Sequence, residues 1–460
     1  MDAAAARQQE HVRDMLRRFV RRGATSPISK LLSKLRPEDV ATLMRSLTQS
    51  ERLEVFRILV REYPDATGDV VTELEPHQRN ELFERVGAEE SARILHQMPV
   101  DDAVYVLDSL PGELREEVME IVDLHPGSEM QAQLTYEDDT AGRIMIPEFF
   151  SLPESTPVRD AVAAIQENRD VELIFYLYIV DAEERLVGVT SLRQLLLAPP
   201  GKTLGQIAQR DVIKAHTGTD QEEVAQVAAR YDLLAIPVVD EEDRLVGIVT
   251  VDDIVDIFKE EATEDFLKMV GTTEEEIANP ERSLRVAGIR LPWLLINMVG
   301  LVISGLLLER FSVTFQEALF LLTFVPVIMG MGGNSGSQTS TITVRGLATG
   351  RLVPGQGRVG RFLWQQLKVG LVLGLALGLV VGVIAVLLEQ NPAYAAVVGV
   401  SLFFAILTAS LSGTLIPLAA QRLGIDPAIA AGPLVTTSND IVGLLIYFGF
   451  AALLIRTLVP

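Results

Sequence analysis

The chain has 460 residues, with 62 Asp and Glu against 40 Lys and Arg, a formal net charge of −22, and no cysteine. The absence of cysteine excludes disulfide scaffolds, cysteine-based zinc sites, cysteine nucleophiles and iron–sulfur clusters. From residue 281 onward there are 6 acids and 11 bases, so residues 1–278 hold 56 acids and 29 bases, a net charge of −27. So acidic a region would repel phosphate, which argues against nucleic acid as a partner.

The first region, residues 1–135, is predicted to be an acidic α-helical domain. Its N-terminus is basic but has no apolar run, so it does not read as a signal peptide. A pattern of one apolar residue, turn or cap residues and an amphipathic helix recurs in steps of 12 within two blocks. The copies begin at Leu35, Leu47, Leu74, Val86, Met98 and Leu110. Units this short cannot bury a face alone, so we expect them to stack into a helical solenoid.

The second region contains a longer repeat, which divides it into residues 136–200 and 201–259. VDAEERLVGV from Val180 matches VDEEDRLVGI from Val239, an offset of 59. In each copy a helix-period segment and a strand-like run precede the motif, and another helix follows it. This β–α–β–β–α pattern, written twice, resembles a tandem pair of cystathionine-β-synthase (CBS) domains. The resemblance implies an α/β disc of a kind that often binds adenine nucleotides or regulatory cations.

The two copies differ where such pairs bind a nucleotide. The second copy has Thr250-Val-Asp-Asp253, a hydroxyl and a carboxylate that resemble the family's ribose site, whereas the first reads Ser191-Leu-Arg-Gln194 and lacks the Asp. The residues that would serve an ATP site are Tyr176, Arg193, Thr250 and Asp252. Whether ATP binds is left open, because the first-copy Asp is missing.

Residues 252–278 are predicted to form an acidic helix that connects the CBS region to the rest of the chain. Asp253, Asp256, Glu260 and Glu264 follow one another at helical spacing, so neighbouring carboxylates repel. One interpretation is an ordinary solvated face. The other is that divalent cations bridge the carboxylates, and hard oxygen ligands suit Mg²⁺ or Ca²⁺.

Residues 279–460 contain five apolar runs, each longer than the roughly 20 residues that cross a bilayer. They cover residues 286–308, 318–344, 362–388, 393–420 and 432–458. Nine Lys or Arg lie beside these runs on one side and two, Arg310 and Arg456, on the other. The positive-inside rule therefore predicts a cytoplasmic N-terminus and, with five spans, an extracytoplasmic C-terminus in the cell membrane. The predicted fold class is multidomain: an α-helical solenoid, α/β CBS domains and an all-α membrane domain of five spans.

Two of the spans have unusual composition. The second is predicted to be interrupted at Pro326, before a stretch rich in glycine, amides and hydroxyls at residues 330–341. Such a stretch is unfavourable against lipid, so it is expected to line a water-filled path or a protein interface. In the third span, glycines recur every four residues from Gly370 to Gly382, which favours close helix packing over chemistry.

The fifth span contains Asp440, the one carboxylate well inside a predicted span. An ionised group at that depth is costly unless it faces water, a partner or a cation. Thr436, Thr437, Ser438 and Asn439 precede it and supply further oxygen atoms. Because Mg²⁺ usually keeps most of its waters, few charges together with hydroxyls suit its passage. A buried neutral Asp is the structural alternative, and this chemistry does not separate Mg²⁺ from Mn²⁺, Co²⁺ or Ca²⁺.

In this order of regions, and in two motifs, the chain resembles the MgtE family of magnesium channels. The motifs are Gly332-Gly-Asn-Ser-Gly-Ser-Gln338 and Pro433-Leu-Val-Thr-Thr-Ser-Asn-Asp440. The resemblance implies a homodimer in the lipid bilayer, with a pore on the two-fold axis and Asp440 as the principal Mg²⁺ ligand. The expected pore residues are Asp440, Asn439, Thr436, Thr437 and Asn334.

The resemblance also implies that cytosolic Mg²⁺ closes the pore by binding between the N-terminal domain, the CBS domains and the connecting helix. ATP binding is seen within the family as well. The expected regulatory residues are Asp101, Asp102, Glu222, Asp232, Asp253, Asp256, Glu261, Glu264 and Asp265.

Two other functions remain compatible with the sequence. A cation-coupled secondary transporter of divalent metals would also need an intramembrane acid, and a membrane-anchored CBS sensor scaffold would use the spans only as an anchor. An enzyme is disfavoured, because there is no Walker A sequence, no HExxH and no Ser or Cys nucleophile motif.

Overall fold

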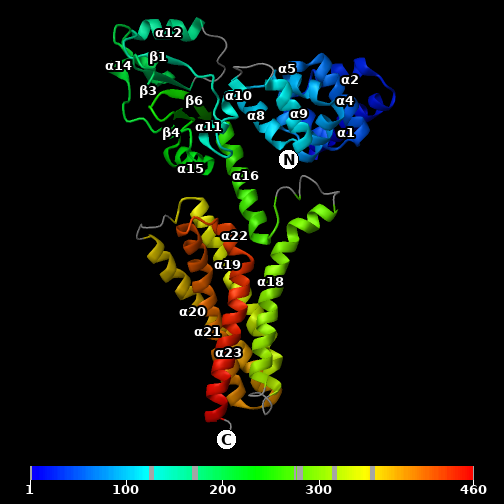
Figure 1. The fold of residues 1–460 in the computed structure, drawn as a ribbon, viewed down its shortest axis with the longest axis vertical. Coiled ribbons are helices and arrows are strands. Elements are labelled where there is room, and N and C mark those ends of the chain that lie inside the picture. The colour runs from blue at the N-terminus through cyan, green and yellow to red at the C-terminus, as the bar shows by residue number, and fades with distance from the viewer. Residues whose placement is uncertain are drawn as a thin grey trace. The chain divides into compact units, whose positions relative to one another are not determined.

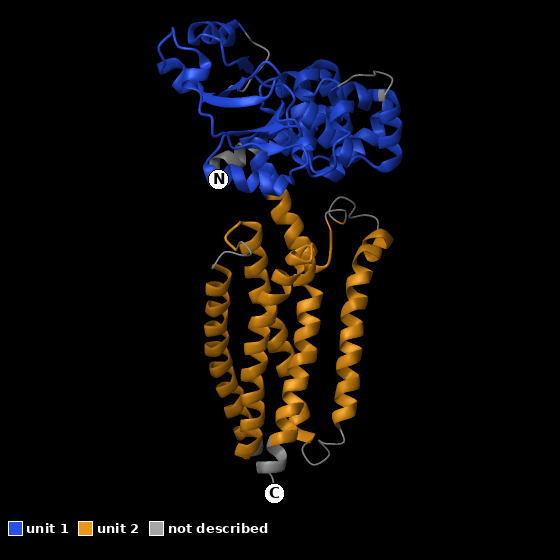
Figure 2. Cartoon of the chain, turned by 60° about the vertical axis from the view of Figure 1, so that its left-hand side comes forward, with its two compact units in different colours: residues 1–258 blue, residues 259–460 orange. Residues whose placement is uncertain are grey.

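The computed structural model describes residues 3–123, 129–167, 175–273, 276, 283–312, 319–352 and 358–458. The chain divides into two compact units, Met1–Phe258 and Lys259–Pro460, coloured separately in Figure 2. The boundary falls inside helix α16 (Val251–Val270). The predicted start of the second span at residue 318 lies outside the described residues, as do residues 274, 275, 277 and 278 of the predicted connecting helix and the C-terminal residue 460.

The first unit begins with a succession of helices, in blue and cyan in Figure 1. They are α1 (Ala3–Arg21), α2 (Thr25–Leu32), α3 (Pro37–Arg45), α4 (Gln49–Glu62), α5 (Pro64–Thr72), α6 (Pro76–Val86), α7 (Ala88–Leu95), α8 (Val100–Ser109), α9 (Gly112–Asp123) and α10 (Glu129–Gln133). Helices α3, α4, α6, α7, α8 and α9 each begin two residues after the start of a predicted repeat, so the helical N-terminal fold is confirmed.

The local sequence explains these helix starts. Proline occupies the first turn of α3 and α6, where its missing N–H costs nothing, and Thr48 with Glu51 forms a capping box at α4. Apolar faces of the helices meet in one continuous core that includes Phe56 and Phe83. Helix α5 fills the interval between the two blocks of repeats, where the 12-residue pattern predicts no helix.

The rest of the first unit holds the two CBS copies. Their elements are α11 (Ala141–Ile144), β1 (Ser151–Pro153), α12 (Val158–Glu167), β2 (Tyr176–Val180), β3 (Leu186–Ser191), α13 (Leu192–Leu197), α14 (Leu204–Ile207), β4 (Ala215–His216), α15 (Gln221–Tyr231), β5 (Ala235–Val239) and β6 (Leu245–Thr250). In each sheet a parallel and an antiparallel pair run in the order β1-β2-β3 or β4-β5-β6. Strands β5 and β6 repeat β2 and β3 at an offset of 59, which confirms the predicted duplication.

A buried ion pair joins the helical part to the CBS part within the first unit. Asp108 on α8 accepts hydrogen bonds from Nε and Nη2 of Arg143 at 2.9 and 2.8 Å, and Arg143 is only 5% exposed. Arg115 donates to the same carboxylate at 2.8 Å. Helix α11, which carries Arg143, is in turn hydrogen-bonded beside β4 through Gly142 and Thr217. The pair therefore fixes α8 relative to the second CBS copy.

The second unit contains the long apolar helices, which run alongside one another in Figure 1. They are α18 (Ser283–Ser312), α19 (Val325–Ala348), α20 (Arg358–Glu389), α21 (Pro392–Arg422) and α23 (Pro433–Leu458), with the 3₁₀ turn η2 (Leu319–Phe324) before α19 and the short α22 (Pro427–Ala431) before α23. Five helices of the described residues are long and apolar enough to span a membrane, so the multi-pass fold is confirmed.

One local prediction was wrong. Pro326 does not interrupt the second span; it lies in the first turn of α19, where proline is tolerated, and the polar stretch at residues 330–341 is helical.

The expected close packing of the third span is confirmed. A Cβ on Gly374 or Gly378 would come 2.9 Å from the carbonyl oxygen of Phe403 or 2.6 Å from that of Gly399, so only glycine lets α20 approach α21 this closely.

Candidate metal-binding sites

Asp440 lies in the second turn of α23 and faces the glycine-rich part of α19. A Cβ built on Gly333 would lie 3.5 Å from Asp440 Oδ1 and 3.4 Å from the methyl group of Thr436. The glycine thus brings the α19 backbone close to the carboxylate. Asp440 is only partly buried, so the chain's own atoms leave one side of it uncovered.

Hydroxyl groups continue from Asp440 along the same face of α23. Thr436 lies one turn before Asp440, and its hydroxyl is hydrogen-bonded to that of Ser337 at 3.3 Å. Thr437, one residue on, turns toward α18 instead and donates to Asn297 Oδ1 at 3.2 Å. Of the two threonines, Thr436 is the one that lies with Asp440 beside Gly333.

The two asparagines expected near the ion occupy different environments. Asn439 is 4% exposed, and its Oδ1 accepts a hydrogen bond from Ser412 Oγ of α21 at 2.5 Å. A Cβ on Gly336 would overlap Asn439 Nδ2, so this amide is enclosed between three helices. Asn334 on α19 is exposed. The structure groups Asp440 with Thr436 and Ser337, and it separates Asn439 from them.

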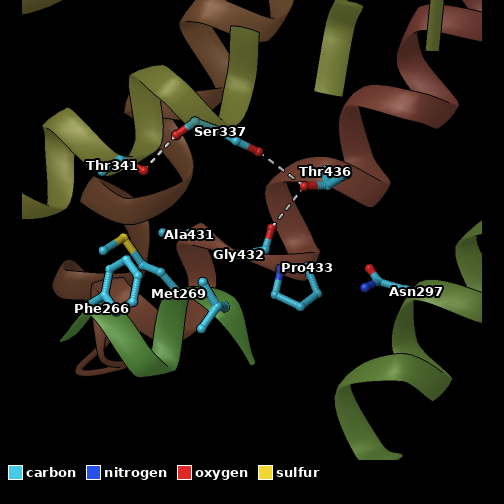
Figure 3. Close-up of a pocket in the computed structure, with 10 residues that line it drawn as sticks. Phe266, Met269, Asn297, Ser337, Thr341, Ala431, Gly432, Pro433 and Thr436 are labelled. Atoms are coloured by element: carbon cyan, nitrogen blue, oxygen red, sulfur yellow. Dashed lines mark hydrogen bonds between the residues drawn. The ribbon is translucent and has the colours of Figure 1, made fainter. Parts of the chain in front are cut away.

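A cavity of about 350 Å³ lies in the second unit beside Thr436 (Figure 3). Helices α18, α19 and α22–α23 contribute mostly polar or small residues: Asn297, Ser337, Thr341, Ala431, Gly432, Pro433 and Thr436. The last turns of α16 contribute the apolar side chains Phe266, Met269 and Val270. The hydroxyl groups of Thr436, Ser337 and Thr341, which we call the hydroxyl row, therefore lead from Asp440 into this cavity. The wall of the cavity on the α16 side is apolar.

In the first unit, carboxylates of α8 face carboxylates of α16. Burial, and then the charges of Asp253 and Asp102, raise the pKa of Asp101 to about 8, and its Oδ1 is buried with no hydrogen-bond partner. Burial, opposed by a hydrogen bond from Thr250, and then neighbouring acids raise the pKa of Asp253 to about 7. These groups repel one another unless a proton or a cation intervenes.

Asp102 completes this acidic interface. Burial, followed by the charges of Asp69, Asp252 and Asp256, raises its pKa to about 6, while the charge of Arg79 opposes the change. The interface thus brings together four expected regulatory residues, Asp101, Asp102, Asp253 and Asp256. Asp69, on α5, is an additional member that the sequence did not single out.

Glu222 and Asp232 are placed apart from each other. Glu222 lies in the first turn of α15 and accepts a hydrogen bond from Gln226, whereas Asp232 is the left-handed C-cap of the same helix. Ten residues of helix separate them by about 15 Å, so one ion held by a single chain does not contact both.

A second acidic group lies in the second unit, where α16 meets α22. Burial and then the charge of Asp426 raise the pKa of Asp265 to about 6, with Glu261 and Glu264 adding to the effect. Asp426 was not anticipated; it stands in the short loop before α22 and caps that helix through Ala428 N at 2.7 Å. Lys268 Nζ contacts Asp426 at 2.7 Å and Glu264 at 2.6 Å.

The residues expected to bind ATP lie on different CBS copies. Tyr176 begins β2 and Arg193 is exposed on α13, both in the first copy. Thr250 ends β6 in the second copy; it is fully buried, and its hydroxyl donates to Asp253 at 2.7 Å. Asp252 is exposed. The Thr250–Asp253 pair thus caps α16 in this structure.

The donor sets fit a hard divalent cation, because they consist of carboxylate and hydroxyl oxygen. Buried carboxylates with raised pKa values, one of them with an unpaired oxygen, gain most from a counter-ion. Within the part of the chain that the structure describes, however, no three His, Asp or Glu residues are already arranged around one point. A single chain therefore offers pairs of ligands that a second group would complete.

Comparisons with known proteins agree with this architecture. The chain matches the family described as "Divalent cation transporter" (MgtE) over residues 325–450, the MgtE intracellular N domain over residues 35–139, and the CBS domain over residues 141–201 and 204–260. It is 34% identical to "Magnesium transporter MgtE" of Thermus thermophilus over 97% of this chain and 99% of the relative. Identity to the protein of the same name from Bacillus subtilis is 32% over 96% of both chains.

Among solved structures, the chain is similar to "Crystal structure of the cytosolic domain of the Mg2+ channel MgtE in complex with ATP". That similarity has 34% sequence identity and a TM-score of 0.49, and it covers 53% of this chain and 98% of the other.

Proposed function

This chain belongs to the MgtE family of divalent cation transporters, and from that premise we propose that it conducts Mg²⁺ across the cell membrane. The observation that carries the proposal is the setting of Asp440. Among the described residues of the five spans, the other acid, Glu309, lies near the end of α18. A charge as deep as Asp440 is retained where it meets water or a cation.

A second copy of the chain would complete the permeation site. One Asp440 with the hydroxyl of Thr436 offers too few ligands to replace the waters of Mg²⁺, but suits an ion that keeps them. Two copies facing each other across a two-fold axis would provide two carboxylates and two hydroxyl rows. The partly uncovered side of Asp440 supports this homodimer. Asn439, enclosed by Ser412 and Gly336, would then serve packing rather than contact with the ion.

The cavity suggests where the path closes. Its hydroxyl-lined wall would hold hydrated ions, while Phe266, Met269 and Val270 form the opposing apolar wall. Phe266 and Val270 are 60% and 61% exposed in the single chain. Movement of the end of α16 toward Ser337 and Thr341 of α19 would replace water by apolar side chains and so stop conduction.

The acidic interfaces support regulation by cytosolic Mg²⁺. Without a cation, the carboxylates of α8 and α16 repel one another, which favours separation. A bound divalent ion would offset that repulsion and draw α16 toward a fixed position, at a site distinct from the pore. Asp101, Asp102, Asp253 and Asp256 would hold ions in the first unit. Asp265 with Asp426 would do so in the second, where Glu261 and Glu264 add charge.

The remaining parts of the proposal concern orientation and nucleotide. The charge asymmetry of the span ends supports a cytoplasmic position for residues 1–278, with the C-terminus on the other side. ATP at the CBS pair, with Tyr176, Arg193, Thr250 and Asp252 nearby, stays a prediction. Its binding would have to compete with the hydrogen bond between Thr250 and Asp253.

Uptake into proteoliposomes tests the transport proposal. We expect wild-type protein to take up Mg²⁺ along its gradient, and Asp440→Ala and Asp440→Asn to reduce uptake by about a hundredfold, because either change removes the pore charge. Glu309→Gln is the matched control, since it removes a carboxylate near the end of a span and should leave most uptake intact. Equal uptake by wild type and Asp440→Ala would refute the assignment. Uptake that requires an H⁺ or Na⁺ gradient would indicate a coupled transporter instead.

A further inference from the structure

Lys268, near the end of α16, contacts Asp426 in the loop before α22. Its ammonium lies 2.7 Å from Asp426 Oδ2 and 2.6 Å from Glu264 Oε1, so it bridges α16 to a residue 158 positions away. The side chains of Lys268 and Asp426 are 24% and 28% exposed, which strengthens the pair relative to one in open water.

The neighbouring residue, Met269, also contacts α22. It packs against a buried cluster of Ala428 and Ala431 of α22 with Val344 of α19; the two alanines are 0% and 3% exposed. At the far end of α22, a Cβ on Gly432 would overlap the carbonyl oxygen of Met269, so the two backbones are in direct contact there. Lys268 and Met269 therefore hold the short helix at both of its ends.

Helix α22 is connected to the pore residues without an intervening loop. Gly432 is the single residue between α22 and α23, and Asp440 follows it by eight residues, or about 12 Å of helix. A shift of α22 with α16 would therefore displace the start of α23 and the hydroxyl of Thr436. The contact between α16 and α22 can therefore position α23, the helix that carries Asp440.

We propose that Lys268 is a positioning residue whose ammonium takes the place of a divalent ion beside Asp426 and keeps α22 attached to α16 when Mg²⁺ is scarce. The inference rests on the proposed regulatory function of Asp265 and Asp426. It implies that α22 stays attached to α16 in both functional states, through the ammonium when Mg²⁺ is scarce and through the ion when Mg²⁺ is bound, so that α16 and α22 move as one body. Removing the ammonium makes the contact dependent on Mg²⁺.

The test uses the absence of cysteine from the chain, which lets one introduced thiol report on one position. Ala428→Cys places that thiol in the buried cluster against which Met269 packs. In the full chain in lipid nanodiscs, maleimide should label it slowly in both EDTA and Mg²⁺. With Lys268→Met added, we expect labelling in EDTA to be about tenfold faster, the factor expected on losing one charge-assisted hydrogen bond. Millimolar Mg²⁺ should make it slow again.

Two matched variants separate this role from a general effect on folding. Lys268→Arg keeps the charge and should keep slow labelling, whereas Lys259→Met removes the same charge from an exposed site on α16 and should change nothing. If Ala428→Cys itself labels rapidly, Ala431→Cys replaces it as the reporter. Slow labelling of Lys268→Met in EDTA would overturn the proposal, as would fast labelling that no Mg²⁺ concentration reverses. Failure of the proposed function would appear separately, as wild-type uptake that cytosolic Mg²⁺ does not inhibit.

Discussion

The two units use carboxylates in opposite ways. In the membrane-spanning unit, Asp440 stands among hydroxyl groups and glycine, with Thr436 one turn away. In the first unit, Asp101 and Asp102 of α8 face acids of α16, and their pKa values rise because of burial and neighbouring charge. The first arrangement suits a weak, passing contact with a hydrated ion. The second suits an ion that is held long enough to change a conformation.

A contrast within the first unit sharpens this comparison. Asp108, on the same helix as Asp101, is neutralised by Arg143 and Arg115, whereas the buried Oδ1 of Asp101 has no hydrogen-bond partner among the described residues. Helix α8 therefore makes two kinds of contact. The ion pair of Asp108 with Arg143 is permanent, and we call it the permanent joint. The contact of Asp101 with the acids of α16 depends on an external cation or a proton, and we call it the conditional joint. We infer that the permanent joint serves as the pivot for the conditional one.

The largest expected effect concerns the permanent joint. Arg143→Met leaves Asp108 half-buried with one partner, and we expect it to destabilise the first unit by about 3 kcal/mol, in the range for breaking a buried ion pair. It should also raise amide hydrogen exchange in α8 and α11. Thermal unfolding and exchange of the full chain measure both effects.

The exposed pair of Arg159 and Asp160 supplies the control for that prediction. Arg159→Met removes a surface ion pair and should change stability by less than about 0.5 kcal/mol. If the two variants behave alike, Asp108 and Arg143 do not form a joint of special importance.

The next effect concerns packing around the isolated carboxylate. Gly336→Ala adds a methyl group where Asn439 Nδ2 lies, so the enclosed Asn439 amide must shift or α19 and α23 must separate, and we expect a loss of about 2 kcal/mol in stability of the membrane domain. Gly330→Ala, on the same helix but with open space at its Cβ, should be neutral or slightly stabilising. Thermal unfolding in detergent compares them. Equal melting temperatures would show that Asn439 is not held as tightly as the contact implies.

The sequence predicted the fold well where a local pattern is repeated. The turn after β2 and the turn after β5 share an Asp, a Glu and an Arg at an offset of 59, and both fold alike: Asp181 accepts from Arg185, and Asp240 accepts from Arg244, at 2.8–2.9 Å. The shared Asp and Arg, which make these hydrogen bonds, are enough to give the same turn. The prediction failed at Pro326, because proline at a helix start and proline inside a helix look the same without knowledge of the boundary.

The candidate sites were harder to anticipate, because they depend on which way a side chain faces. Asn439 and Asp440 are adjacent oxygen-bearing residues in the sequence, but neighbours on a helix point about 100° apart, and only Asp440 faces Gly333. Asp426 was missed because tertiary packing alone brings it to Lys268. The one signal in the sequence was that Asp426 is an acid among the span ends that carry most of the Lys and Arg residues.

A smaller effect tests the conditional joint through pH. The pKa values of about 8 for Asp101 and about 7 for Asp253 exceed the ordinary 3.8, so the folded unit binds protons more tightly than the unfolded chain. Stability should therefore fall as pH rises from about 4 to about 8, by on the order of 1.5 kcal/mol after partial relief by salt and water. Thermal unfolding in EDTA across pH 5 to 9 measures it, and Mg²⁺ should stabilise most above pH 8. Stability that increases over this window would contradict the assignment.

The smallest effect separates repulsion from ion binding at one residue. Asp253→Asn keeps an oxygen to accept from Thr250 but removes the charge that faces Asp101, so in EDTA we expect stability to rise by about 1 kcal/mol. The same variant should lose most of the stabilisation that Mg²⁺ gives wild type, because a carboxylate ligand is gone. Glu241→Gln, an exposed acid in the turn after β5, should change neither quantity. If Asp253→Asn is less stable in EDTA yet still responds fully to Mg²⁺, the carboxylate serves as a helix cap, and the contrast between the two units would rest on Asp101 and Asp102 alone.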